Sequence, residues 1–261
     1  QLKMRKKWES DPHPYLFFNT DGHTFTFFGF YIDRRTGSII DPNTSKILFE
    51  NQITMRRELI NGIDLQNPNL LRENIAQLGK IEKIKKLLYV MGIDWAIHNQ
   101  ANIVDPDPTY ELTMDNLLKI IAIYMRLRAN IPVIIMGETG CGKTRLCKYM
   151  CELQKHPTQN HNMNNMYLVK VHGGTTHEEI VNHVNKAQLL ARENNRRNPK
   201  IFTVLFFDEA NSTEAIGTIK EIMCDNRLDG VPLNTNQYNL KFIAACNPYK
   251  KHSQEAIESF E

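Results

Sequence analysis

Long apolar runs are missing from this sequence. Hydrophobic residues make up 41% of its 261 positions, yet no stretch of them approaches the ~18 residues that a membrane-spanning helix needs. The opening segment, residues 1–8, is basic and has no apolar stretch after it, which argues against a secretory signal. We therefore expect no transmembrane segment, and a core large enough for one sizeable domain or somewhat more.

Cysteine is scarce, and its number and spacing exclude two further classes. The chain has 5 cysteines, an odd count, and no two of them form a C-x-x-C pattern. A disulfide framework needs paired cysteines, and a structural zinc site needs closely spaced ligands. We therefore predict reduced thiols in an intracellular compartment, the cytoplasm and specifically the cytosol.

Neither sign of charge is in marked excess. The 32 lysine and arginine residues nearly balance the 29 aspartate and glutamate residues, and the net charge is +3. A protein that grips nucleic acid through its phosphates usually carries a clear basic excess. We therefore expect no direct nucleic-acid binding.

The sequence that is present divides at a stiff segment, Asp105–Pro108, which reads D-P-D-P. Before it, residues 23–32 are aromatic and β-branched and are followed by a turn sequence, which predicts a β-hairpin. Apolar residues then recur at spacings of three and four over 71–88 and end near Gly92, which predicts a helix. Residues 1–104 are thus predicted to be a hairpin plus helical segment, and 105–261 a second domain.

The second domain is predicted to alternate strands and helices. Helices are expected at 113–128, 145–154, 176–193 and 213–225, and strands at 132–136, 167–171, 201–207 and 240–246. The run 201–207 is continuously apolar, as strands buried on both faces are. This alternation predicts an α/β fold with a mostly parallel sheet flanked by helices.

The run into Thr144 is the most specific motif. An apolar segment, which we expect to form a buried strand, leads into G-x-x-x-x-G-K-T, the pattern of a phosphate-binding P-loop, and a helix follows. Glycines let successive backbone N–H groups face one anion, and the helix start favours negative charge. Lys143 is expected to reach the β- and γ-phosphates, and Thr144 to place its hydroxyl on Mg²⁺. The predicted nucleotide-binding residues are Gly137, Glu138, Thr139, Gly140, Cys141, Gly142, Lys143 and Thr144.

Polar residues at the ends of two later apolar strands complete a predicted hydrolysis site. Asp208 follows Thr144 by 64 residues and is expected to hold Mg²⁺ with it. The adjacent Glu209 is positioned to polarise a water for attack on the γ-phosphate. Asn247 ends the next strand, where its amide would contact the γ-phosphate or orient the water. Because Asn-Pro is also a common turn, a purely structural role for Asn247 remains the alternative.

These three motifs, in this order, resemble the P-loop NTPases of the AAA+ class. Residues 133–144, 207–211 and 242–249 closely resemble an AAA+ unit of the mysterin family, the giant dynein-like AAA+ RING ubiquitin ligases, and residues 13–18 and 110–116 extend the resemblance. It implies ATP and Mg²⁺ as ligands, ATP hydrolysis catalysed by Glu209, Lys143 and Asn247, and a parent chain with several such units plus distant ligase elements. Dynein and midasin modules share this style of loop and are the alternative families.

The resemblance also implies partners and a truncation. The partners are neighbouring AAA+ units of the same chain and, through distant parts of the parent, a ubiquitin-conjugating enzyme. Because the chain stops shortly after Asn247, we expect the helical lid and the last sheet strand to be absent, and residues 1–104 to be the tail of a preceding unit. Two functions follow: hydrolysis that couples nucleotide state to scaffold conformation, or a structural unit that binds nucleotide without hydrolysing it.

Overall fold

The structure, a computed structural model, describes residues 15–18, 25–33, 36, 38–41, 44–50, 77–93, 103–156 and 162–248. The chain forms two compact units, residues 1–121 and 122–261. Helix α5 (Met114–Arg128) crosses from one to the other. The division predicted between residues 104 and 105 therefore stays a prediction.

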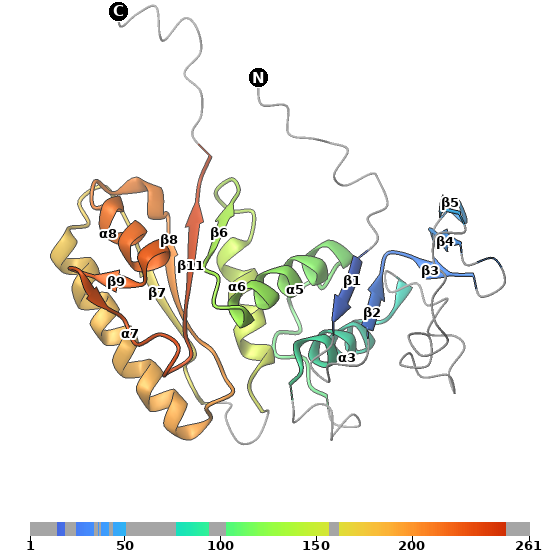
Figure 1. Cartoon of the computed structure of the whole chain (residues 1–261), viewed down its shortest axis with the longest axis horizontal. Helices are drawn as coiled ribbons and strands as arrows, with labels where there is room; N and C mark the ends of the chain where they lie inside the picture. The colour runs from blue at the N-terminus through green and yellow to red at the C-terminus, as the bar shows by residue number, and fades with distance from the viewer. Residues whose placement is uncertain are drawn as a thin grey trace, which may run out of the picture. The chain divides into compact units, whose positions relative to one another are not determined.

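In its described residues the first unit contains short antiparallel strands, helix α3 (Lys80–Met91) and the start of α5 (Figure 1). Its strands are β1 (Tyr15–Phe18), β2 (Phe25–Phe28), β3 (Tyr31–Ile32), β4 (Ile39–Ile40) and β5 (Ile47–Phe49). They form two separate sheets, β1-β2 and β3-β4-β5. Gly29, with φ of 75°, divides the apolar stretch 23–32 between β2 and β3, because a left-handed residue ends an extended strand.

Helix α3 (Lys80–Met91) is the helix predicted before Gly92. Gly92 adopts φ of 69°, and its N–H bonds back to the carbonyls of Leu88 and Tyr89, a glycine-terminated helix end. The predicted residues 71–76 lie outside the described part of the chain. At its other end Lys80 pairs with Asp105 at 2.5 Å and donates to the carbonyl of Asp107 at 2.8 Å, so the stiff D-P-D-P segment is tied to α3.

The second unit is built on a four-stranded parallel sheet in the order β6-β11-β8-β7, coloured from green to red in Figure 1. The sheet strands are β6 (Val133–Met136), β7 (Met166–Lys170), β8 (Thr203–Asp208) and β11 (Leu240–Cys246). Helices α6 (Lys143–Leu153) and α7 (His177–Arg197) are the connections between β6, β7 and β8. The predicted α/β parallel architecture is confirmed.

The stretch between β8 and β11 is more broken than predicted. A short 3₁₀ turn, η4 (Ala210–Ser212), comes first. In place of one helix over 213–225 there are α8 (Ile216–Lys220) and a π-helical turn, η5 (Glu221–Asp225). The hairpin strands β9 (Arg227–Leu228) and β10 (Val231–Pro232) follow. The turn between them was predicted at Asp229-Gly230, and both residues have positive φ, as a two-residue hairpin turn requires.

Burial differs sharply between the central and the edge strands. Residues 203–207 of β8 are all buried, which confirms the prediction of a strand covered on both faces. Along one face, side chains of β7, β8 and β11 pack against α7, α8 and η5 in one apolar cluster. Strand β6 was also expected to be buried, and this was wrong: Ile134 is 62% and Met136 69% exposed. Within the described residues β6 pairs on one side only, with β11.

None of the helices in the described part of the chain combines the length and the apolar character that crossing a bilayer requires.

Candidate functional site

The three predicted motifs meet at one edge of the parallel sheet. The glycine-rich loop 137–142 follows β6, Asp208 ends β8, and Asn247 follows β11, the strand between them. Parallel strands end at the same edge, where open α/β sheets bind their ligands. The topology therefore brings together residues that are 64 and 104 positions apart in the sequence.

Backbone geometry in the loop depends on its glycines. Gly140 and Gly142 have φ of 82° and 87°, a region that side-chain-bearing residues rarely adopt. A Cβ on Gly137 would lie 2.8 Å from the Sγ of Cys141, closer than two such atoms can approach. The N–H of Gly137 donates to the carbonyl of Cys246 at 3.2 Å. The loop is thus attached to the end of β11, and positive φ accounts for glycine at positions 140 and 142.

Lys143 is the hub of the loop. It is the first residue of α6, and only 9% of it is exposed. Its Nζ donates to the carbonyls of Gly137 at 2.6 Å and Glu138 at 2.9 Å, and to Oδ1 of Asn247 at 3.1 Å. The ammonium is therefore held by acceptors from two different segments, the loop and the end of β11.

Thr144 and Asp208 form the second contact across the sheet edge. The Thr144 hydroxyl donates to Oδ2 of Asp208 at 3.0 Å. A hydroxyl oxygen and a carboxylate oxygen are hard metal ligands, the kind that Mg²⁺ prefers. The pair predicted as metal-binding is thus brought together, and its chemistry fits that ion.

Glu209 and Asn247 form the third contact. The side-chain amide of Asn247 donates through Nδ2 to Oε1 of Glu209 at 3.3 Å, while its Oδ1 accepts from Lys143. Glu209 has φ of 56° and is exposed. A non-glycine residue in this region is held there by its surroundings, and such residues concentrate at functional sites. Asn247 therefore connects the exposed carboxylate to the P-loop lysine.

Asn211 is a site residue to which the sequence analysis gave no role. Its Nδ2 donates to the carbonyl of Asn247 at 2.9 Å, and its Oδ1 accepts from the N–H of Asn247 at 3.3 Å. Both bonds are to backbone, so Asn211 sets the position of Asn247 rather than its side-chain orientation. The sequence feature that could have indicated this role is the position of Asn211 two residues after Glu209, in the sequence D-E-A-N.

The remaining loop residues contribute mainly backbone. The side chains of Glu138, Thr139 and Cys141 are exposed, and the Sγ of Cys141 lies 3.8 Å from the Nζ of Lys143. Beneath the loop, burial together with the nearby Cys151 and Asp208 raises the pKa of the Cys147 thiol. Burial likewise raises the pKa of Cys246, an effect that a hydrogen bond involving Asn211 and the charge of Lys143 oppose. These inner thiols are neutral at physiological pH.

A parallel sheet with a glycine-rich loop after one strand and an acidic pair at the end of another defines a P-loop module of the AAA+ class. The comparison with known families specifies it further: residues 110–250 match the RNF213 AAA domain. The chain belongs to this family, which confirms the mysterin-type resemblance. Membership in an AAA family indicates nucleotide binding in general.

Relatives match along nearly the whole chain. The sequence is 46% identical to E3 ubiquitin-protein ligase rnf213-beta of Danio rerio over 263 residues, and 47% identical to E3 ubiquitin-protein ligase RNF213 of Mus musculus over 265; both alignments cover 100% of this chain. The Homo sapiens RNF213 ligase is 46% identical over 98% of it. The chain spans 5% of the length of each of these relatives.

Among solved structures, that of C. elegans PCH-2 aligns with 74% of this chain and 44% of its own, at 14% sequence identity and a TM-score of 0.28.

Proposed function

We propose that this chain binds ATP with Mg²⁺ at the sheet edge and hydrolyses it, as an AAA+ unit of an RNF213-type ubiquitin ligase. The observation that carries the proposal is the connected set Lys143–Asn247–Glu209, in which one amide bonds to the P-loop lysine and to an exposed carboxylate. A binding-only site needs the lysine and the metal carboxylate. A carboxylate held beside them in addition supports hydrolysis.

Binding would use the groups that the loop already orders. The backbone N–H groups of residues 137–142 and the start of α6 would receive the phosphates, as helix starts do. Lys143 would bind the β- and γ-phosphate oxygens, exchanging its present contacts with loop carbonyls for phosphate contacts. Thr144 and Asp208 would hold Mg²⁺, directly and through water. Mg²⁺, when bound, would neutralise charge on the phosphate oxygens.

Hydrolysis would use the exposed carboxylate. Glu209 would accept a proton from the attacking water, and the Asn247 amide would orient both the carboxylate and the water. Lys143 would stabilise the charge that develops on the transferred phosphoryl group. These roles are those that the sequence predicts for the same three residues, and they stay proposals.

The wider role follows from the relatives, which are named E3 ubiquitin-protein ligases. We propose that neighbouring AAA+ units of one polypeptide are the partners of this one, and that its nucleotide state changes the conformation of the scaffold they form. Ligase activity and contact with a ubiquitin-conjugating enzyme would belong to other parts of that polypeptide, in the cytosol.

The test compares wild type with Glu209→Gln in a polypeptide that keeps this chain among its neighbouring units. We expect phosphate release attributable to this unit to fall by roughly 10²- to 10⁴-fold, the usual contribution of a general base. Binding of a fluorescent ATP analogue should be unchanged, because Gln keeps the size and the acceptor oxygen of Glu. Lys143→Met serves as the matched variant that should lose binding itself.

The second candidate is a unit that binds nucleotide and does not hydrolyse it. One observation favours it: Oε1 of Glu209 already accepts a hydrogen bond from Asn247, so this oxygen is engaged by the protein and not by a water. Equal phosphate release by wild type and Glu209→Gln, with intact binding, would reject hydrolysis and leave this structural role. If Lys143→Met and Thr144→Ala both still bind nucleotide as wild type does, the proposed nucleotide site is rejected.

A further inference from the structure

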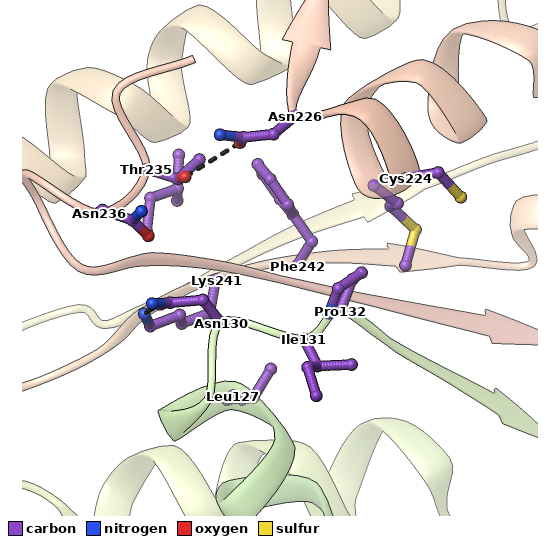
Figure 2. A pocket seen from close by; sticks show the side chains of 12 residues that line it. Leu127, Asn130, Ile131, Pro132, Cys224, Asn226, Thr235, Asn236, Lys241 and Phe242 are labelled. Carbon is purple, nitrogen blue, oxygen red and sulfur yellow. Dashed lines mark hydrogen bonds between the residues drawn. The ribbon is translucent and has the colours of Figure 1, made fainter. Parts of the chain in front are cut away.

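A cavity of about 170 Å³ lies at the opposite end of the sheet strands from the P-loop. Its lining comes from the end of α5 and the residues between α5 and β6, from η5 and the residue after it, and from the start of β11 and the loop that precedes it. In Figure 2, Lys241 and Asn130 lie on one side, Asn226, Thr235 and Asn236 on the other, and Phe242 between them. Along β11 it is separated from Asn247 by roughly 20 Å, the length of the strand, so it is a different site.

Lys241 is the unusual member of this lining. Only 6% of it is exposed, and its Nζ donates to Oδ1 of Asn130 and lies 5.1 Å from the centre of the Phe202 ring. Among the described residues no carboxylate lies within ion-pairing distance of it. Burial lowers the pKa of its ammonium below the ordinary lysine value. Buried lysines are normally paired, because an unpaired buried charge is costly.

The other polar groups in the cavity are matched to an incoming acceptor. A lysine ammonium has three N–H donors, of which one is directed at Asn130. Asn130 and Asn236 are exposed, and in the described contacts their side-chain NH₂ groups donate to no protein acceptor. By contrast, the Oδ1 of Asn226 already accepts from Thr235 at 2.9 Å, and its Nδ2 donates to Leu233 at 3.2 Å. The groups with spare capacity therefore include a cation and two amide donors.

The rest of the wall is apolar. Leu127, Ile131, Met223 and Phe242 line the cavity together with the polar residues. A hydrated inorganic anion gains no binding free energy from contact with these apolar side chains. A hydrocarbon stem does, because the contact removes its surface from water. A cation and an amide donor on one side, a second amide across the cavity and apolar side chains around them fit a carboxylate on a short aliphatic stem.

We propose that this cavity binds a carboxylate carried on two or three methylene groups, with Lys241 as its counter-ion and the Asn130 and Asn236 amides as further donors. Two sources share this chemistry: a free short-chain acid, and a glutamate side chain of another protein segment. The occupied site would supply the negative partner that Lys241 lacks among the described residues. Its occupancy does not depend on the nucleotide site.

The test follows the side-chain amide signals of Asn130 and Asn236 by ¹H–¹⁵N NMR of the full chain during titrations at constant ionic strength. Asn130→Gly and Asn236→Ala assign the two signals; glycine suits position 130, where φ is 58°. The probes are butyrate, its uncharged isostere butyramide, inorganic phosphate, and glutamate blocked at both ends. We expect saturable shifts with butyrate, and none with butyramide.

Lys241→Met should weaken butyrate binding by about 10- to 100-fold, the effect of losing one hydrogen bond to a charged group. Methionine keeps the unbranched stem, so the fold should survive. Lys186→Met, at an exposed lysine of α7, is the matched control and should bind as wild type does. Asn236→Ala removes an exposed donor without touching the core and should weaken binding several-fold, which keeps the test decisive if Lys241→Met unfolds.

Binding of blocked glutamate in addition to butyrate would assign the site to a protein side chain, and binding of butyrate alone would assign it to a free acid; both outcomes support the proposal. Equal shifts with butyramide or with phosphate would overturn the assignment to a carboxylate with an aliphatic stem. Undiminished butyrate binding in both Lys241→Met and Asn236→Ala would overturn the site itself.

Discussion

Asn247 joins the P-loop lysine to the Glu209 carboxylate at the end of β8. Its Oδ1 accepts from Lys143, its Nδ2 donates to Glu209, and its backbone is held on both sides by Asn211. An amide suits this place because it offers a donor and an acceptor in one plane. A carboxylate would repel Glu209, and an aliphatic side chain would leave Lys143 with one acceptor fewer.

Removing the support behind Asn247 should lower the rate of hydrolysis without abolishing nucleotide binding. In Asn211→Ala both bonds to the Asn247 backbone are lost, and we expect phosphate release to fall by about tenfold, equivalent to ~1.4 kcal/mol in the barrier. Steady-state kinetics should show the loss in kcat, because the P-loop contacts of the nucleotide are unchanged. Asn182→Ala, at an exposed amide of α7, is the control; an equal decrease there would contradict a local role.

The Thr144–Asp208 pair makes a prediction about Mg²⁺. We expect Mg²⁺ to strengthen the binding of an ATP analogue. In Thr144→Ala the hydroxyl that donates to Asp208 is lost. The factor by which Mg²⁺ strengthens binding should then be at least about tenfold smaller, the contribution of one hydrogen bond to a charged group. Thr144→Ser keeps the hydroxyl and should retain most of the tightening. Binding titrations with and without Mg²⁺ measure this, and an identical Mg²⁺ effect in the alanine variant would remove Thr144 from the metal site.

Buried Cys151 should make stability fall at high pH. Burial raises the pKa of this thiol to about 12, from an ordinary value of 9.0. The folded protein therefore keeps the proton more tightly than the unfolded chain, so the contribution to stability is full below pH 9 and is lost as pH rises toward 12. Denaturant unfolding of Cys151→Ala should show a shallower loss over this range than wild type, while Cys224→Ala, at an exposed thiol, should match wild type.

Local sequence signals specify α7 almost completely. The Thr176 side chain accepts from the N–H of Glu179, and the Glu179 side chain accepts from the N–H of Thr176, the reciprocal bonds that the sequence T-x-x-E predicts. The helix continues beyond the predicted Glu193 to Arg197, since arginines favour the last turn. This helix could be predicted because its start depends on residues three positions apart.

Thr176→Ala should destabilise the second unit by about 1 kcal/mol, the usual value of a helix N-cap. The capping hydroxyl is lost, while no buried side chain changes. Urea unfolding followed by circular dichroism gives the free energy. As a control, Asn185→Ala at an exposed position inside α7 should be neutral or slightly stabilising, because alanine is the better helix former. A loss as large in Asn185→Ala would mean that the capping box contributes nothing particular.

Strand β6 shows where local patterns fail. Its composition is that of a buried strand, but Ile134 and Met136 are largely exposed. The position of a strand in a sheet depends on which strands pair with it, and β6 pairs with β11, about 110 residues further along the chain. The predicted helix 213–225 is instead divided into α8 and η5, whose Ile219, Ile222 and Met223 belong to the apolar cluster that also contains residues of α7 and β11.

The five thiols form a set of probes for the protein as it folds and binds. Cys141 and Cys224 are exposed, Cys147 and Cys151 are buried, and Cys246 is in between. Alkylation at pH 8, followed by mass spectrometry of peptides, should modify Cys141 and Cys224 rapidly. The two buried thiols should react only at the rate of unfolding.

Under the proposed function, ATP with Mg²⁺ should slow alkylation of Cys141, which lies inside the P-loop, and leave Cys224 unchanged. At an ATP concentration 100 times its Kd, about 99% of the loop would be covered, so protection should approach 100-fold. The ratio of the two rates cancels any effect of nucleotide on the reagent. Equal rates at Cys141 with and without nucleotide would place the bound phosphate elsewhere.

The alternation of strands and helices and the P-loop pattern were sufficient to predict the fold class, because strand periodicity and glycine conformation are local properties. The roles given to the P-loop residues, the acidic pair and Asn247 stay predictions. Three things required the folded chain: the edge position of β6, the support of Asn247 by Asn211, and the burial of Lys241 beside Asn130 at the other end of the sheet. Each depends on contacts between segments that are 36 to 111 positions apart. Such contacts arise from strand order and packing, and no local pattern encodes them.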